Sequence, residues 1–523
     1  MYWADKIAKE IISSKKFKPY WVDDMKTPSG FAHVGSLRGP IIHSLIFRAL
    51  KDAGVEVKFT FVINDFDHAD ELPPEFKDEL KNYMGFPLRK IPSPSKGYDS
   101  LGMLLADDFN KVMSELGVEA EILSSWDMYH QGKFDGVIKE ALDAGEKIQD
   151  LYQKISGSRK KEAGWLPFQV ICEECGRLGT TRVYDWDREK VSYKCEPSLV
   201  TWSEGCGNEG KISPFGGTGK LPWKVDWAAH WKVIGVTVEA AGKDHASAGG
   251  SYDIALTLCD EVFNWPKPFN FGYEFFLIGG RKMSSSKGLG LKAHDLINVL
   301  PAELGRFLFA RSDYREQINF DPVGTMAIPD LFDEYDRCWL AYIEGTNENL
   351  ARVFELSLIK GVPDEKPIFL PRFRDVANYL EQPNVDLVKK FEELKGSELT
   401  PVELKLLNQR EKYAKIWIKK YAPQELKYEM LDELPRGLKL GDKEKEFLEK
   451  VVDLVEEKKD AEDLQQAIYN LTKEIKLDTK EAFTALYQVL IGKDHGPKAA
   501  WFLLSLPKKK VIQRLNEAVG VKS

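Results

Sequence analysis

Two glycine-containing segments combine a flexible backbone with hydroxyl and basic side chains. The first, residues 27–36, has the sequence Thr-Pro-Ser-Gly-Phe-Ala-His-Val-Gly-Ser and lies between an expected strand and an expected helix. Free backbone N–H groups and the helix dipole favour phosphate there, and Gly30 and Gly35 allow a nucleotide to approach the backbone closely. His33 adds a hydrogen-bonding group. Taken alone, the segment is equally consistent with a tight turn, because short motifs recur by chance.

The second segment, residues 279–288, has the sequence Gly-Gly-Arg-Lys-Met-Ser-Ser-Ser-Lys-Gly. Its three cationic side chains and three hydroxyls suit a loop that holds a polyphosphate while negative charge moves onto the leaving oxygens. The alternative is a solvated surface loop, which the unusual sequence Lys-Met-Ser-Ser-Ser-Lys disfavours.

Four of the six cysteines lie in one segment rich in glycine and aromatic residues: Cys172, Cys175, Cys195 and Cys206. The first two have the Cys-x-x-Cys spacing with which two thiolates hold one zinc ion, while the other two are more loosely spaced than in the common ribbon pattern. We predict a closed structural zinc site, the alternative being four reduced cysteines packed as small hydrophobic residues. Cys259 and Cys338 lie in apolar helical segments and are expected in the core.

Strands and helices alternate in the first part of the chain. Short apolar runs predict strands over 20–23 and 55–63, with a helix over 37–53 between them. A strand, a glycine turn, a helix and a strand are typical of a parallel sheet. Strand patterns return at 233–240 and 271–278, and the chain beyond residue 301 is predominantly of helical pattern.

Composition excludes several classes of protein. The 523 residues are 43% hydrophobic and 30% charged, as expected of a globular chain with several cores. No apolar run approaches the roughly 20 residues needed to cross a bilayer, and residues 1–16 form an amphipathic pattern without a signal-peptide core. We therefore expect a cytoplasmic protein that is not bound to a membrane. The net charge of −8 does not exclude nucleic-acid binding, because the local field decides that.

Together, the His-x-Gly turn at 33–35 and the Lys-Met-Ser-Ser-Ser loop resemble the two signature sequences of class I aminoacyl-tRNA synthetases. Further segments are similar to class I lysyl-tRNA synthetases: residues 221–227, 241–245, 249–251 and 491–497. The resemblance spans nearly the whole chain, with its motifs in the right order. It implies that lysine is activated with ATP and Mg²⁺ to lysyl-adenylate, releasing pyrophosphate. The lysyl group then passes to the 2′-hydroxyl at the 3′ end of tRNA(Lys), releasing AMP.

The resemblance also implies roles for individual residues. Catalytic roles fall on His33, Gly35, Ser36, Lys282, Ser284, Ser285 and Lys287. ATP and the adenylate would be bound by Ser29, Gly30, His33, Gly35, Asp244, His245, Lys282 and Lys287. The amino acid would be bound by Thr27, Trp223 and His245. For Trp223, ordinary core packing is the alternative. We expect the lysine ammonium to meet a carboxylate at the end of the strand over 55–63, with Asp65 predicted and Asp67 as its neighbour, although a helix cap or solvent would equally suit them.

Some residues depart from the family pattern. Met25 replaces the glycine usual two residues before Thr27, which leaves another amino-acid specificity as an alternative. A catalytically silent tRNA-binding protein is a second alternative, disfavoured because His33, Lys282 and Lys287 are intact. Basic residues beside an aromatic at 415–420, and a basic cluster at 508–514, suit a tRNA backbone, with a solvated helix face as the alternative.

These patterns predict an α/β fold of three parts. A Rossmann-type parallel-sheet catalytic domain occupies 1–300, with an insertion at 66–120 and a cysteine-rich, zinc-ribbon-like insert at 165–220. A connecting stem follows at 301–345, and an all-α anticodon-binding domain occupies 346–523. The oligomeric state is not determined by these patterns.

Overall fold

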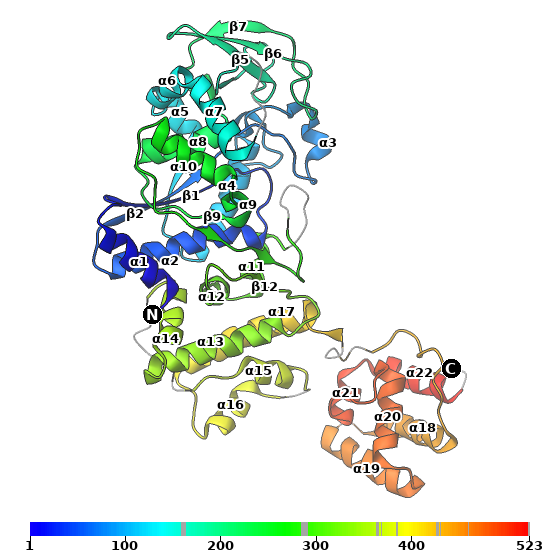
Figure 1. Ribbon diagram of the computed structural model, residues 1–523. Coiled ribbons are helices and arrows are strands. Elements are labelled where there is room, and N and C mark those ends of the chain that lie inside the picture. Colours follow the sequence, from blue (N-terminus) through cyan, green and yellow to red (C-terminus); the bar gives the residue numbers. More distant parts are fainter. Residues whose placement is uncertain are drawn as a thin grey trace. The chain divides into compact units, whose positions relative to one another are not determined.

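A parallel sheet forms the centre of the N-terminal part of the computed structural model (Figure 1). Strand β1 (Tyr20–Lys26) pairs in parallel with β2 (Val57–Ile63), and β2 pairs in parallel with β3 (Glu121–Ser124). On the other side of β1, Val238 bridges Val22 and then Phe269, again in parallel. The order is therefore β3, β2, β1, the segment at Val238 and the segment at Phe269. This is a doubly wound order that reverses between β1 and Val238, and it confirms the predicted Rossmann-type class.

Helices cover both faces of this sheet. Helices α1 (Trp3–Ser14) and α2 (Arg38–Asp52) lie on one side, and α8 (Trp223–Ile234) and α10 (Ser251–Glu261) lie on the other (Figure 1). Strand β2 is accordingly buried over its last five residues, as expected of a parallel strand covered on both faces.

The strand expected over 233–240 begins later than predicted. Val233 and Ile234 are the last residues of α8, and Gly235 ends that helix in the left-handed conformation (φ +94°). The apolar run thus continues from a helix into a strand. The strand expected over 271–278 divides into β10 (Gly272–Tyr273) and β11 (Phe276–Leu277), because the first half pairs with β9 (Ala241–Gly242) and the second with β12 (Ile318–Asn319).

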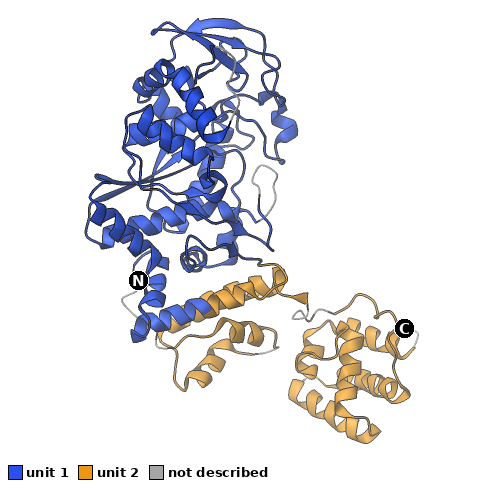
Figure 2. Cartoon of the chain, in the orientation of Figure 1, with its two compact units in different colours: residues 1–321, 334–362 blue, residues 322–333, 363–523 orange. Residues whose placement is uncertain are grey.

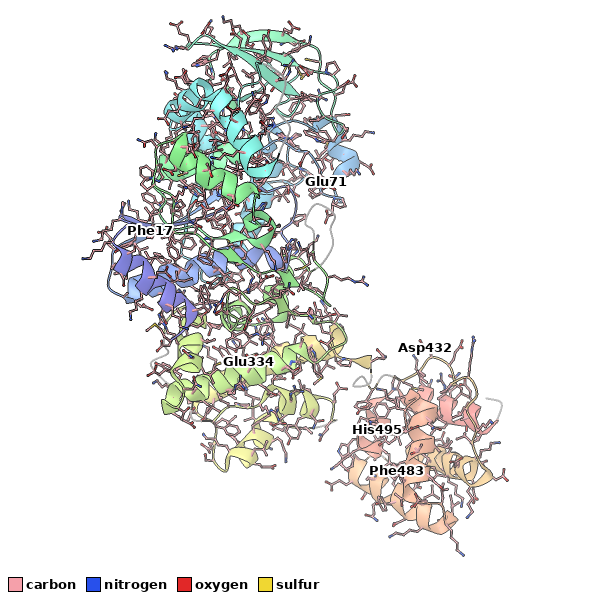
Figure 3. The ribbon with its side chains drawn as sticks, in the orientation of Figure 1. Phe17, Glu71, Glu334, Asp432, Phe483 and His495 are labelled. Atoms are coloured by element: carbon pink, nitrogen blue, oxygen red, sulfur yellow. The ribbon has the colours of Figure 1, made fainter. Side chains whose placement is uncertain are left out.

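The chain that follows β2 has a small core of its own, formed by Leu72, Leu80, Leu88 and Ile91 with the start of α4. Its elements are α3 (Lys77–Leu80), η2 (Lys81–Tyr83), η3 (Leu88–Lys90) and α4 (Leu101–Glu115). Glu71 lies close to α3 in Figure 3. After β3 come α5 (Ser125–His130), α6 (Asp135–Asp143) and α7 (Gly145–Ser156).

The cysteine-rich segment is built from short antiparallel strands. One pair joins β4 (Gln169–Val170) to β8 (Gly219–Lys220). A second sheet has the order β5 (Thr181–Trp186), β6 (Val191–Cys195) and β7 (Glu209–Ile212), and lies at one end of this part of the chain (Figure 1).

The structure describes residues 1–157, 164–283, 291–361, 366–367, 369–382, 385–424, 428, 430–458 and 460–520. They form two compact units, one of residues 1–321 and 334–362 and one of residues 322–333 and 363–523 (Figure 2). The first unit also contains η1 (Val34–Leu37), α9 (Lys243–Ala246), α11 (Ala293–Val299), α12 (Ala302–Ala310) and α14 (Glu348–Ser357).

The second unit is helical in its described residues. Its elements are α15 (Phe373–Leu380), α16 (Leu387–Lys395), α17 (Pro401–Lys420), α18 (Asp442–Glu457), α19 (Ala461–Ile475), α20 (Thr479–Ile491), α21 (Ala499–Ser505) and α22 (Lys508–Val519), while α13 (Ala327–Glu344) contributes residues to both units. Trp417, in the segment predicted to contact tRNA, is buried beside Phe373 and is a core residue. No helix in the described part of the chain is long and apolar enough to cross a membrane.

Candidate active site

A cavity of about 1360 Å³ lies at the carboxyl ends of β1 and the segment at Val238. This is the switch point of the doubly wound sheet, where such folds bind ligands. The cavity lining includes many of the residues singled out in the sequence: Thr27, Ser29, His33, Gly35, Ser36, Trp223, Asp244, His245 and Lys282. Gly30 is buried next to Ser29 and is not part of the lining. Ser284, Ser285 and Lys287 lie outside the described residues.

His33 caps the turn that opens the helical segment η1. The backbone N–H of Ser36 donates to Nδ1 of His33 over 3.2 Å. Burial, and next the positive charge of Lys26, lower the pKa of His33 to about 4. At neutral pH the ring is therefore uncharged, and because Nδ1 accepts a hydrogen bond its hydrogen is on Nε2. Such a ring can donate one hydrogen bond to a phosphate oxygen.

The described parts of the two signature segments lie side by side, although more than two thirds of the first unit separates them in sequence. A Cβ atom on Gly35 would come within 2.8 Å of the Met283 side chain and 3.1 Å of the His33 ring, so a larger residue here would have to displace both side chains. Beyond the loop, Val34 N–H donates to Leu291 O over 2.8 Å. Lys282 extends its ammonium over the ring of Phe275 and also faces the cavity.

A buried cluster of charged side chains contacts Thr27. The Thr27 hydroxyl donates to Asp67, which pairs with Lys220, and Lys220 also pairs with Asp226 over 2.9 Å. The Lys220 side chain is only 2% exposed. Burial raises the pKa of Asp67, but Lys220 and Thr27 more than offset this and lower it overall. With two aspartates and one lysine, the cluster has one excess negative charge, and the hydroxyl of Tyr129 donates to Asp226.

Aromatic rings form another part of the cavity wall. Trp223 is 47% exposed, so it is not the core residue that its apolar setting also allowed. Its ring lies 6.2 Å from that of Trp227, and the imidazole of His245 meets both indoles edge-on at 5.8 and 5.7 Å. Trp227 is largely buried, and it lines the cavity beside the other two rings.

Asp65, predicted to meet the lysine ammonium, has its carboxylate occupied within the protein. It accepts hydrogen bonds from the Ser124 hydroxyl at 2.8 Å, from Trp126 N–H at 3.0 Å and from Arg89 at 3.1 Å. It is not part of the cavity lining, whereas Asp67 is.

The cavity lining also contains polar residues that were not predicted from the sequence, namely Asp24, Lys220, Asp226, Glu239 and Tyr273. The positions of three of them in the sequence could have indicated this location. Asp24 and Glu239 lie where two neighbouring strand segments end, and Asp226 lies inside the segment 221–227.

The four cysteines of the insert come together. Their Sγ atoms lie within 4.8 Å of one another, with Cys172 and Cys206 at 3.6 Å and Cys175 and Cys195 at 3.7 Å. Four thiolates at about 2.3 Å from one zinc ion would be about 3.8 Å apart, so the donor set fits tetrahedral zinc. Burial raises the pKa of the Cys175 thiol, but hydrogen bonds with Arg177 and neighbouring thiols lower it overall to about 7. Cys259 and Cys338 are buried elsewhere, as predicted.

With both signature segments at the switch point of a doubly wound sheet, the first unit has the architecture of a class I aminoacyl-tRNA synthetase. Residues 1–360 match the family described as tRNA synthetases class I (K), and residues 416–519 match the anticodon binding domain. The chain belongs to this lysine family of class I synthetases, which confirms the resemblance drawn from the signature segments.

Curated relatives cover the full length of the chain. The lysine–tRNA ligase of Archaeoglobus fulgidus is 32% identical over 523 residues, covering 99% of this chain and 100% of the relative. The lysine–tRNA ligase of Methanocaldococcus jannaschii is 34% identical over 541 residues, covering 99% of each. Among solved structures, a glutamate tRNA ligase from Elizabethkingia meningosepticum matches at 12% identity and a TM-score of 0.39, covering 97% of this chain and 100% of that one.

Proposed function

We propose that this chain is a lysine–tRNA ligase that activates lysine with ATP and transfers it to the 3′ end of tRNA(Lys). The observation that carries the proposal is the meeting of both signature segments at one cavity, in a chain that matches lysine–tRNA ligases over its full length. The enzyme would act in the cytoplasm, where tRNA is aminoacylated. The residues matched to an anticodon binding domain supply the second contact with tRNA.

Activation needs no nucleophile from the protein. A lysine carboxylate oxygen attacks the α-phosphorus of ATP, the bond to the bridging oxygen breaks, and pyrophosphate leaves. His33, uncharged and carrying its hydrogen on Nε2, donates to a phosphate oxygen, and the ammonium of Lys282 stabilises negative charge on the leaving pyrophosphate. Ser284, Ser285 and Lys287 act with Lys282, while Asp244 faces the adenosine side. Mg²⁺ accompanies ATP and offsets its charge.

Transfer follows in the same cavity. The 2′-hydroxyl of the terminal ribose attacks the carbonyl carbon of the adenylate, and AMP leaves as the new ester forms. Trp223 and His245 hold the amino acid against Thr27 during both steps.

Recognition of the lysine ammonium rests on carboxylates that face the cavity. Asp67, with the excess negative charge of its cluster, and Asp24 are better placed than Asp65, whose hydrogen bonds go to β3 and its neighbours. Met25 also lines the cavity, where its apolar side chain suits the methylene stem of lysine.

The cysteine cluster is proposed to hold one structural zinc ion. Cys172, Cys175, Cys195 and Cys206 would be its four ligands, and a closed set of thiolates leaves no position for a reacting group. The ion would join the turn after β4 to the loop between β6 and β7.

The test is amino-acid-dependent exchange of labelled pyrophosphate into ATP, run with each of the twenty amino acids in the presence and absence of tRNA. Exchange with lysine alone supports the proposal. Exchange with another amino acid keeps the mechanism and refutes the specificity, and folded protein that binds tRNA without any exchange refutes the enzymatic function.

A further inference from the structure

Glu239 is a buried residue whose two carboxyl oxygens both accept hydrogen bonds from one helix. It directly follows Val238 at the switch point and is 1% exposed. One carboxylate oxygen accepts from the indole N–H of Trp227 over 2.7 Å, and the other accepts from the indole N–H of Trp231. These two tryptophans are four residues apart on α8, so a single carboxylate fixes the rotation of two neighbouring indoles.

A carboxylate is a costly choice at this position. Burial raises the pKa of Glu239 and a second buried carboxylate, Asp24, raises it further, while the two indole hydrogen bonds and His43 offset this only in part. An apolar side chain would avoid this penalty but would leave the indole N–H groups of Trp227 and Trp231 buried without an acceptor. The carboxyl group therefore satisfies both donors and, because a hydrogen bond is directional, also fixes the orientation of both indoles.

Trp227 passes this orientation on to the cavity. Its ring lies 6.2 Å from that of Trp223, 5.7 Å from that of His245 and 5.2 Å from that of Tyr252. The Tyr252 hydroxyl in turn donates to the backbone carbonyl of Glu239. Trp227 lines the cavity together with Trp223 and His245, so turning its ring would displace the other two, whereas Trp231 is not part of the cavity lining.

We propose that Glu239 is a positioning residue that sets the aromatic wall of the amino-acid site by holding the indole of Trp227. The proposal rests on the proposed function, because it takes Trp223 and His245 as amino-acid contacts. It predicts that a change at Glu239 affects the binding of lysine more than that of ATP. The residues expected to contact phosphate, His33 and Lys282, lie outside this set, and His245 is its one member that the resemblance also assigns to ATP.

The test measures KM for lysine and for ATP in pyrophosphate exchange by Glu239→Gln. Glutamine has one acceptor oxygen and an NH₂ group, so it can satisfy one indole while its own N–H faces the other. We expect KM for lysine to rise about tenfold and KM for ATP to change by less than about twofold.

A rescue variant separates positioning from stability. Trp231→Phe removes the second indole N–H, which allows the glutamine oxygen of the double variant to accept from Trp227. KM for lysine should then fall at least about threefold below that of Glu239→Gln, although the double variant has lost more packing. If Glu239→Gln does not fold, Trp227→Phe and Trp231→Phe replace it. Each removes one hydrogen bond to Glu239, and only Trp227→Phe should raise KM for lysine.

Unchanged KM for lysine in folded Glu239→Gln would overturn the inference. So would an equal rise for both substrates without rescue, which marks a role in stability alone. If the wild-type enzyme activates a different amino acid, the proposed function fails, and Glu239 is judged by the same comparison with that amino acid.

Discussion

Replacing Lys220 by methionine tests the buried ion cluster behind Thr27. Methionine keeps most of the side-chain volume but removes the charge that Asp67 and Asp226 share, leaving two carboxylates close together. Removing one partner of a buried ion pair costs about 3–5 kcal/mol. At roughly 2 °C per kcal/mol for a unit of this size, the Tm at pH 7 should fall by about 6–10 °C.

The matched control is Lys139→Met, because Lys139 pairs with Asp143 at the surface, where the two side chains are 50% and 38% exposed. An exposed pair contributes about 0–1 kcal/mol, so this variant should lose no more than about 2 °C. Differential scanning calorimetry of both variants and the wild type, at matched concentration, gives the comparison.

The pH dependence gives a second criterion. Burial raises the pKa of Asp67, but Lys220 and Thr27 lower it below 3.8 in the wild type. Asp67 therefore stabilises the fold above its unfolded pKa, and this contribution is lost as pH falls through the lower folded pKa. In Lys220→Met the effect of burial on the carboxylate pKa dominates, so the carboxylates take up protons at a higher pH than in the wild type. Protonation removes their negative charge, and the destabilisation caused by two buried, unpaired charges becomes smaller. The Tm difference between variant and wild type should narrow from pH 7 towards about pH 4. A loss no larger than that of Lys139→Met, or a difference independent of pH, would refute the ion-cluster argument.

Three further predictions follow from the site. Thr27→Val removes the hydroxyl that donates to Asp67, and it should raise KM for lysine about tenfold in pyrophosphate exchange while KM for ATP stays near the wild-type value. Because burial and Lys26 lower the pKa of His33 to about 4, its imidazole should titrate near pH 4 by NMR. As the pH falls below about 6.5, the unfolded chain binds this proton before the folded protein does, so the free energy of unfolding should decrease between about pH 6.5 and pH 4. His33→Asn removes the titrating group and should lessen that decrease. Cys206→Ser should lose bound zinc by elemental analysis, whereas Cys259→Ser, a buried cysteine outside the cluster, should retain it.

The signature segments could be predicted from sequence because their chemistry is local. The turn with His33 and Gly35 comes after a strand and begins a helical segment. A turn of that kind orients its backbone N–H groups in the same way whatever surrounds it. The Cys-x-x-Cys spacing was informative for the same reason. The α/β class followed from periodicity, since strands and helices repeat their apolar residues at different intervals.

The choice between Asp65 and Asp67 was not available to sequence reasoning. Both follow β2, where the alternation of the strand has ended and a turn sets the direction of each side chain; in that turn Asp67 N–H donates to Asn64 O over 3.2 Å. The same limit applies to Trp417, whose apolar and basic neighbours did not show which face of α17 is covered.

By itself, the sequence determined the class of fold, the two signature segments and the zinc-type cysteine spacing, because each depends on residues close together in the chain. Only the tertiary structure decided which charged groups share the cavity. Lys220 meets Asp67 across 153 positions, and Glu239 meets Trp227 across a helix and a turn. Such pairs are selected by burial, since a charge removed from water is stable only where packing brings a partner to it, and packing depends on the whole fold.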